Sequence, residues 1–138
     1  MKVLIDTNVI LDVLTGRKPH VESSSSFLKL CGTQIMGFVL ASQTTDIFYI
    51  LCREGKTEAE AKAVIRKLVD NVKMLDVFSS DAKNALDSNM IDYEDALLAY
   101  SSKHHKIDRI VTRNENDFKN SPVPALSPQD FMEEFFSA

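Results

Sequence analysis

No stretch of this sequence approaches the roughly 20 consecutive apolar residues that a membrane-spanning helix needs, so we expect no membrane segment. The N-terminus also lacks the basic stretch, apolar core and small-residue cleavage site of a signal peptide. The chain has only two cysteines, Cys31 and Cys52, and their separation matches no metal-binding or redox motif. We therefore expect both thiols to be reduced and mostly buried, in a cytoplasmic protein.

Several catalytic motifs are missing as well, and each absence removes a class of enzyme. There is no glycine-rich phosphate-binding loop, and no local motif suggests a Ser-His-Asp hydrolase. The three histidines, His20, His104 and His105, lack the spacing of zinc ligands, and we expect them on the surface or in the core. A phosphoaspartate hydrolase resembling the haloacid dehalogenases would need an aspartate two residues after Asp6, where this chain has Asn8.

The sequence is otherwise ordinary in composition. Its 138 residues, 44% hydrophobic and 26% charged, suit one compact domain, residues 1–138, with a full hydrophobic core. The net charge of −4 would by itself argue against a nucleic-acid partner. If five aspartates share one site, however, setting aside their charges leaves the rest of the chain at +1, and bound divalent metal would reverse the local sign. These are Asp6, Asp46, Asp92, Asp95 and Asp117.

The chain opens with a short apolar run that ends in polar residues. Residues 2–5 predict a buried strand, and Asp6, Thr7 and Asn8 mark the start of a helix that packs back on it. In open α/β sheets, ligands bind at the carboxyl edge of the strands, which is where Asp6 would lie. The alternative interpretation is that Asp6 or Thr7 only caps the helix.

The same arrangement of strand and acid recurs further along the chain. Residues 35–40 predict a strand buried on both faces, and Asp46 follows in the first turn of the next helix. Asp46 alternatively only complements the dipole of that helix. Residues 107–111 predict another strand. The residues of interest after it are Thr112, Arg113, Asn114 and Asp117.

Two more carboxylates lie at the start of a predicted helix. Asp92 can cap this helix, and Asp95 falls three residues later on the same face. Two carboxylates this close repel each other unless a cation lies between them or one is protonated. We expect Glu94 to face away from the pair, into solvent.

Strands alternate with helices along the chain. We predict further strands at residues 72–78 and 123–126, and further helices at 20–30, 57–68, 79–86 and 128–136. This alternation predicts a three-layer α/β fold with a mainly parallel sheet. Because right-handed crossovers bring the carboxyl ends of parallel strands to one edge, the acids that follow them can converge.

Clustered carboxylates without a histidine or cysteine partner suit hard cations that prefer oxygen ligands, chiefly Mg²⁺ or Mn²⁺. Such cations lower the pKa of a bound water and neutralise the charge that builds on a phosphodiester. The residues therefore predict metal-assisted hydrolysis of a phosphodiester.

Four segments together resemble the PIN-domain ribonucleases and cover nearly the whole chain. They are IDTNVILDVL, ASQTTDIFYIL, DYEDALLAYSSKHH and IVTRNENDF. The resemblance implies a sheet of four or five parallel strands, with an acidic site that binds Mg²⁺ or Mn²⁺ and cleaves RNA. It also implies the toxin of a type II toxin–antitoxin pair, with an antitoxin as partner and a homodimer as its assembly.

The resemblance also implies roles for individual residues. Asp6 and Asp95 match acids of the family's metal site, and Asp92 matches an acid of the most similar subgroup. Asn8 and Thr112 match polar positions that orient carboxylates or the attacking water. We thus expect these metal ligands: Asp6, Asp92, Asp95 and Asp117. The expected catalytic residues are Asp6, Asp46, Asp95 and Asp117.

Two positions depart from the family pattern. Asp46 stands where the family usually has glutamate, and it is shorter by one methylene. Asn114 stands directly after Thr112-Arg113, where the family often has aspartate. Asn114 can still ligate through its carbonyl oxygen, and Asp117 can supply the missing charge.

The sequence leaves three functional hypotheses open. The first is a metal-dependent endoribonuclease, and the second is a catalytically weak or inactive PIN-like module that binds RNA or a protein partner. The third, a DNA nuclease acting on flaps, would need an arch or helical insertion that this chain lacks. Arg17 and Arg113 lie nearest in sequence to the acidic positions, so they are the candidates for RNA contact. The alternative for both arginines is a plain surface charge.

Overall fold

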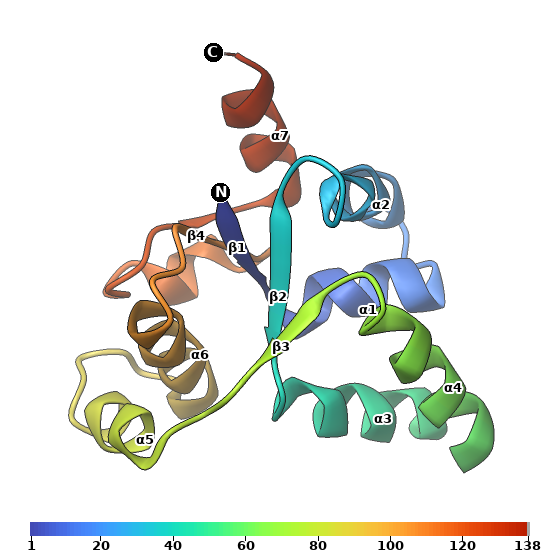
Figure 1. Cartoon of the computed structure of the whole chain (residues 1–138), viewed down its shortest axis with the longest axis horizontal. Coiled ribbons are helices and arrows are strands. Elements are labelled where there is room, and N and C mark those ends of the chain that lie inside the picture. The colour runs from blue at the N-terminus through green and yellow to red at the C-terminus, as the bar shows by residue number, and fades with distance from the viewer. Residues whose placement is uncertain (138) are drawn as a thin grey trace.

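Figure 1 shows a computed structural model of the chain, which describes residues 1–137. Within these residues, five parallel strands form one sheet in the order β3-β2-β1-β4-β5. The strands are β1 (Lys2–Ile5), β2 (Met36–Leu40), β3 (Lys73–Leu75), β4 (Arg109–Val111) and β5 (Ala125–Leu126). The first strand of the chain therefore lies in the centre of the sheet, where Leu4 pairs with Phe38 on β2 and with Ile110 on β4.

Helices cover both faces of this sheet (Figure 1). On one face lie α1 (Thr7–Thr15), α2 (Val21–Leu30), α3 (Gln43–Arg53), α4 (Glu58–Leu68) and α7 (Pro128–Phe136). On the other face lie α5 (Ser79–Leu86) and α6 (Tyr93–His104). A short 3₁₀ helix, η1 (Glu115–Phe118), follows β4. The predicted three-layer α/β fold is confirmed. No helix in the described residues is long and apolar enough to cross a membrane.

The position of the central strand between two layers of helices explains why its sequence does not alternate between apolar and polar residues. Val3 and Ile5 are fully buried in the core beneath α1, α2 and α3. Leu4, between them, is fully buried in the second core beneath α5 and α6. Successive side chains of a strand point to opposite faces. A strand covered by helices on both sides therefore needs apolar residues at every position.

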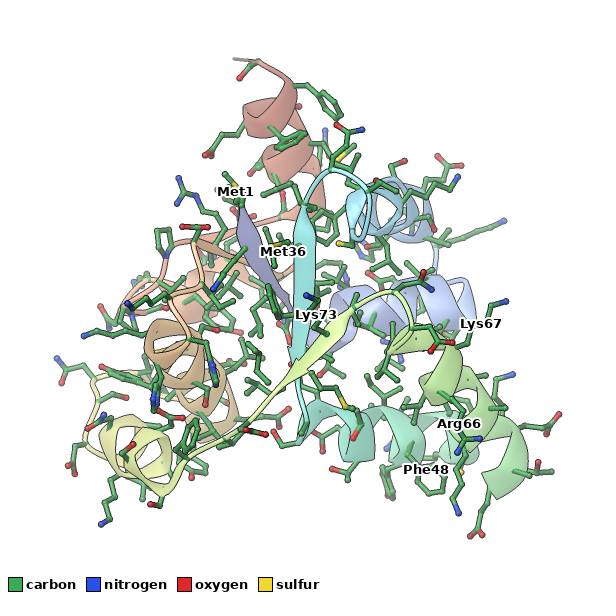
Figure 2. All side chains as sticks on the ribbon, in the orientation of Figure 1. Met1, Met36, Phe48, Arg66, Lys67 and Lys73 are labelled. Carbon is green, nitrogen blue, oxygen red and sulfur yellow. The ribbon has the colours of Figure 1, made fainter. Side chains whose placement is uncertain are left out.

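The third strand is shorter than the predicted range 72–78 and covers only Lys73–Leu75. In the observed register Leu75 pairs with Leu40, which is the last residue of β2. Past Leu75, the chain has no neighbouring strand to bond with, and it leaves the sheet towards α5. Because β3 is an edge strand, Lys73 is exposed at the position shown in Figure 2.

The remaining predictions hold with smaller differences. The last edge strand covers Ala125–Leu126 instead of 123–126, while α7 has the predicted bounds. In the described chain both cysteines are free thiols, as expected. Cys31 is buried, and burial raises the pKa of its thiol to about 12, whereas Cys52 is only partly buried.

Candidate active site

Asp6 directly follows β1, at the carboxyl edge of the sheet. Its backbone N–H donates to the carbonyl of Val111 on the neighbouring strand β4, at 2.9 Å. The carboxylate occupies the N-cap position of α1, where burial raises the pKa of its carboxyl and the nearby backbone N–H groups of Thr7 and Asn8 oppose that rise. Oδ2 also accepts hydrogen bonds from Thr112 Oγ1 at 2.6 Å and from Asn8 Nδ2 at 3.2 Å. Besides its place at the start of the helix, the carboxylate thus has a partner from a distant segment, and both expected supporting residues contact it.

The surroundings of Asp6 have opposing effects on the pKa of its carboxyl. Asp6 is 9% exposed, and this burial raises the pKa of its carboxyl above the ordinary value. The hydrogen bond from Thr112 and the positive charge of Arg113 oppose that rise. Burial favours a neutral carboxyl, whereas a donor or a cation favours the carboxylate. A divalent cation at this place would favour the carboxylate further.

The start of α6 brings two more of the predicted aspartates to this edge. Asp92 caps the helix as predicted, with Oδ1 accepting from the backbone N–H of Asp95 at 2.9 Å. The pKa of Asp95 is raised to about 7, first by burial and then by repulsion from nearby acids. Those acids are Asp92, Asp6, Asp117 and Glu94. The charge on Asp95 is thus opposed by carboxylates that are far apart in sequence, from the residue after β1 and from η1.

Glu94 is exposed to solvent, as expected, and its carboxyl nevertheless interacts electrostatically with these acids. Partial burial raises the pKa of Glu94, and repulsion from Asp46, Asp92 and Asp6 raises it further. Its carboxyl therefore lies within the field of the aspartates at the ends of β1 and α3.

Asp46 lies in the first turn of α3 and is exposed. The position of this helix is fixed by Gln43, a buried residue that the sequence analysis did not single out. The side-chain Nε2 of Gln43 donates to the carbonyl of Ile5 at 2.8 Å, while its Oε1 accepts from the backbone N–H of Leu40 at 2.6 Å. Gln43 thereby joins the ends of β1 and β2, which holds α3 beside the strand that carries Asp6.

The segment after β4 completes the acidic edge. The backbone N–H of Asn114 donates to Thr112 Oγ1 at 3.1 Å. This bond restrains the hydroxyl that contacts Asp6. Asn114 and Asp117 are both exposed. Residues 113–117 line a polar hollow of about 380 Å³. The two residues that were predicted to compensate for each other therefore face the same open space.

The donor set of this edge fits a hard divalent cation in kind, because every candidate ligand offers oxygen. Mutual repulsion of the carboxylates is also what a bound cation would relieve. The carboxylates are spaced more widely than a bound metal ion needs. In residues 1–137, no group of three or more aspartate, glutamate, histidine and cysteine side chains is arranged to hold a metal ion. Metal binding would therefore have to draw the carboxylates together.

Of the two arginines predicted to contact RNA, Arg113 lies at this edge. Its charge acts on Asp6, and its Nε donates to Oδ2 of Asp12 at 2.7 Å. Arg17 instead pairs with Glu54, with 3.5 Å between Nη2 and Oε1. This pair lies beyond the end of α1 that is remote from Asp6. The RNA contact of Arg17 stays a prediction.

Comparisons with known proteins agree with this fold. The family model described as PIN domain matches residues 2–116. No curated protein sequence matches the chain.

Solved structures give the same result at low sequence identity. VapBC2 from Rickettsia felis, bound to a DNA fragment from its promoter, has a TM-score of 0.72 at 15% identity and covers 92% of this chain and 98% of that one. A toxin–antitoxin complex from Klebsiella pneumoniae has a TM-score of 0.68 at 16% identity, over 91% and 97% of the two chains. The sarcin–ricin loop cleaving toxin VapC20 of Mycobacterium tuberculosis has a TM-score of 0.61 at 13% identity, over 78% and 86%. All three share the architecture of this chain.

Proposed function

This chain belongs to the PIN-domain family, and we propose that it is a metal-dependent endoribonuclease, the toxin of a type II toxin–antitoxin pair. One observation carries this proposal: at the carboxyl edge of the sheet, the buried carboxylate of Asp6 is held by Thr112, 106 positions away in the chain, and acids from distant segments act on Asp95 beside it. Aspartates that only capped their own helices would have no reason to meet. Strongly perturbed carboxyls at the carboxyl edge of an α/β sheet are typical of a functional site.

The residues of the acidic edge would have different roles in the reaction. Thr112 and Asn8 hold the carboxylate of Asp6 in one orientation. The metal would be held by Asp6, Asp92, Asp95 and Asp117, with Asp46 and Glu94 adding negative charge beside them. When bound, the cation would neutralise charge that develops on the phosphodiester and lower the pKa of a bound water. Asn114 and Asp117, both exposed, would be the most accessible residues to an incoming substrate.

RNA is the proposed substrate. VapC20, which shares the fold, is a sarcin–ricin loop cleaving toxin, and this supports RNA cleavage here. The net charge of −4 does not oppose the proposal, since much of the negative charge lies at the edge where metal would bind.

An antitoxin is the proposed protein partner, and the surface that suits it is an apolar groove of about 670 Å³ between α1, α2 and α4. Its lining includes Leu14, Leu28 and Val64, and lysines at its rim include Lys29 and Lys67. Lys67 lies on α4, as Figure 2 shows. We propose that the groove takes an amphipathic antitoxin helix whose apolar face is flanked by acidic residues. The Klebsiella complex of toxin and antitoxin, which has the same fold, supports such a partner.

Cleavage of a mixed RNA by the purified protein, with Mn²⁺ or with EDTA, tests the proposed activity. We expect wild-type protein to cleave RNA only when metal is present. The variant Asp6→Asn keeps the shape of the side chain but loses its charge, so it should stay folded and lose cleavage. Circular dichroism provides the folding control. If Asp6→Asn cleaves as fast as wild type in Mn²⁺, the proposed nuclease site is wrong.

A second candidate function is a PIN-like module that binds RNA or a protein without cleaving it. It is favoured by the absence, within residues 1–137, of three side chains already arranged to hold a metal. Calorimetric titration with Mn²⁺ separates the two functions. A nuclease should give heat of binding and a higher melting temperature. If the titration gives no heat and no rise in melting temperature, the result favours the module.

A further inference from the structure

A partly buried ion pair lies directly behind the acidic edge, between Asp12 of α1 and Arg113. Asp12 is 0% exposed, although aspartate is rarely found fully buried without a partner. Its Oδ2 accepts from Arg113 Nε at 2.7 Å and from Ser24 Oγ at 3.1 Å. Its Oδ1 has no partner among the described residues. Arg113 therefore supplies the charge that offsets this buried carboxylate.

The same helix fixes Arg113 at a second point. Asn8 lies four residues before Asp12, which puts both on one face of α1. Its Oδ1 accepts from the backbone N–H of Arg113 at 3.5 Å, while its Nδ2 donates to Asp6. The backbone and the guanidinium of Arg113 are thus both tied to α1. The position of the guanidinium relative to Asp6 is set by one rigid element.

The ion pair occupies only the inner nitrogen of the guanidinium. A guanidinium has five N–H donors in a fixed fork, and within residues 1–137 the terminal Nη groups of Arg113 donate no hydrogen bond. The side chain is 25% exposed and lines the polar hollow together with Asn114 and Asp117. The donors that Asp12 does not use are therefore available at the acidic edge, where a polyanion would otherwise meet mainly carboxylates.

We propose that Arg113 binds a backbone phosphate of RNA through its terminal N–H groups, and that Asp12 is a positioning residue that holds Arg113 for this contact. This inference rests on the proposed function, because it assumes that RNA approaches the acidic edge. Arginine is suited to both tasks, since its fork can bind a carboxylate with one edge and a phosphate with another. Because Asp12 already restrains the guanidinium of Arg113, the side chain loses less conformational freedom when it binds a phosphate.

Fluorescence anisotropy of a short labelled single-stranded RNA, in EDTA so that no metal-dependent cleavage occurs, tests the phosphate contact. Arg113→Ala should weaken binding by about tenfold and reduce the slope of log K against log salt by about 0.7, as for one phosphate contact. Arg109→Ala is the matched control, because it removes the same charge from a partly exposed arginine that is ion-paired with Glu134 at the start of β4, the end of the strand opposite the acidic edge. It should change the affinity less than about twofold.

Two further variants separate a positioning role from a merely structural one. In Arg113→Lys, the single ammonium can pair with Asp12 or with a phosphate but not with both. This variant should melt near the wild-type temperature yet bind RNA as weakly as Arg113→Ala. Asp12→Asn should weaken binding, and the double variant Asp12→Asn/Arg113→Ala should bind no more weakly than Arg113→Ala alone.

Three results would overturn the inference. If Arg113→Ala and Arg109→Ala bind RNA equally well, Arg113 makes no special contact. If Asp12→Asn lowers the melting temperature but leaves RNA affinity and salt slope unchanged, or if Arg113→Lys restores binding, Asp12 has only a structural role. In each of these cases wild-type cleavage can still stand. Wild-type protein that neither binds nor cleaves RNA would overturn both the inference and the proposed function.

Discussion

The hydroxyl of Thr112 donates a 2.6 Å hydrogen bond to Oδ2 of Asp6, a buried contact between residues 106 positions apart in the chain. We expect Thr112→Val, which keeps the side-chain shape but removes the donor, to reduce RNA cleavage by about 10- to 100-fold, because Asp6 loses the group that orients it. The loss of stability should be about 1–3 kcal/mol, since a buried acceptor is left without its partner. Cleavage rates and urea unfolding measure the two effects.

Thr112→Ser provides the control for this change, because it keeps the hydroxyl and removes only a methyl group. It should retain most of the activity. Wild-type cleavage by Thr112→Val would show that the orientation of Asp6 does not depend on this bond.

Replacing Asp95 by asparagine should stabilise the metal-free protein at high pH. The folded-state pKa of Asp95 is about 7, against an ordinary value of 3.8. As the pH rises from about 4 to about 8, the unfolded chain releases this proton before the folded protein does, so the free energy of unfolding falls. Asp95→Asn has no carboxyl to titrate at this position, so it avoids this fall in the free energy of unfolding. Its melting temperature in EDTA should exceed that of wild type at about pH 8 and differ little at about pH 4.

Asp70→Asn is a suitable control for this comparison, because Asp70 is exposed near the end of α4 and belongs to no cluster of acids described above. It should leave the melting temperature nearly unchanged at both pH values. An Asp95→Asn protein that is less stable than wild type at the higher pH would contradict the repulsion inferred at this edge.

Stabilisation by Mn²⁺ should grow with pH. Metal ligands must be deprotonated, so binding displaces the proton that Asp95 retains at low pH. We expect the rise in melting temperature on adding Mn²⁺ to be larger at about pH 8 than at about pH 5. In Asp6→Asn the rise should be small at both. A rise of equal size in wild type and Asp6→Asn would mean that the metal binds elsewhere.

Loss of Gln43 should disturb stability and activity together. Gln43→Leu leaves the N–H of Leu40 and the carbonyl of Ile5 without their side-chain partner, at a cost of about 1–3 kcal/mol for each buried group. It should also slow cleavage, because α3 and Asp46 are no longer tied to β1. Urea unfolding and cleavage rates test both expectations. Gln129→Leu, an exposed glutamine on α7, should change stability by less than about 0.5 kcal/mol, and an equal effect of the two variants would contradict the role of Gln43.

The sequence predicted the layers and the location of the site because both depend on local patterns. Apolar runs that end in polar residues locate the carboxyl edge, and parallel connections bring those ends together. Partners that the fold brings together from distant segments have no such local signal. Asp12 meets Arg113 across 101 positions, and Gln43 meets Ile5 across 38.

The central place of β1 in the sheet has a consequence for how the protein is made. Asp6 precedes its partner Thr112 by 106 positions, so the ribosome synthesises Asp6 long before it synthesises Thr112 and the neighbouring strand β4. A nascent or prematurely terminated chain that stops before β4 lacks one side of that central strand and the whole segment that closes the acidic edge. Whatever chemistry this edge performs, it cannot begin before the segment that carries Thr112 has been translated.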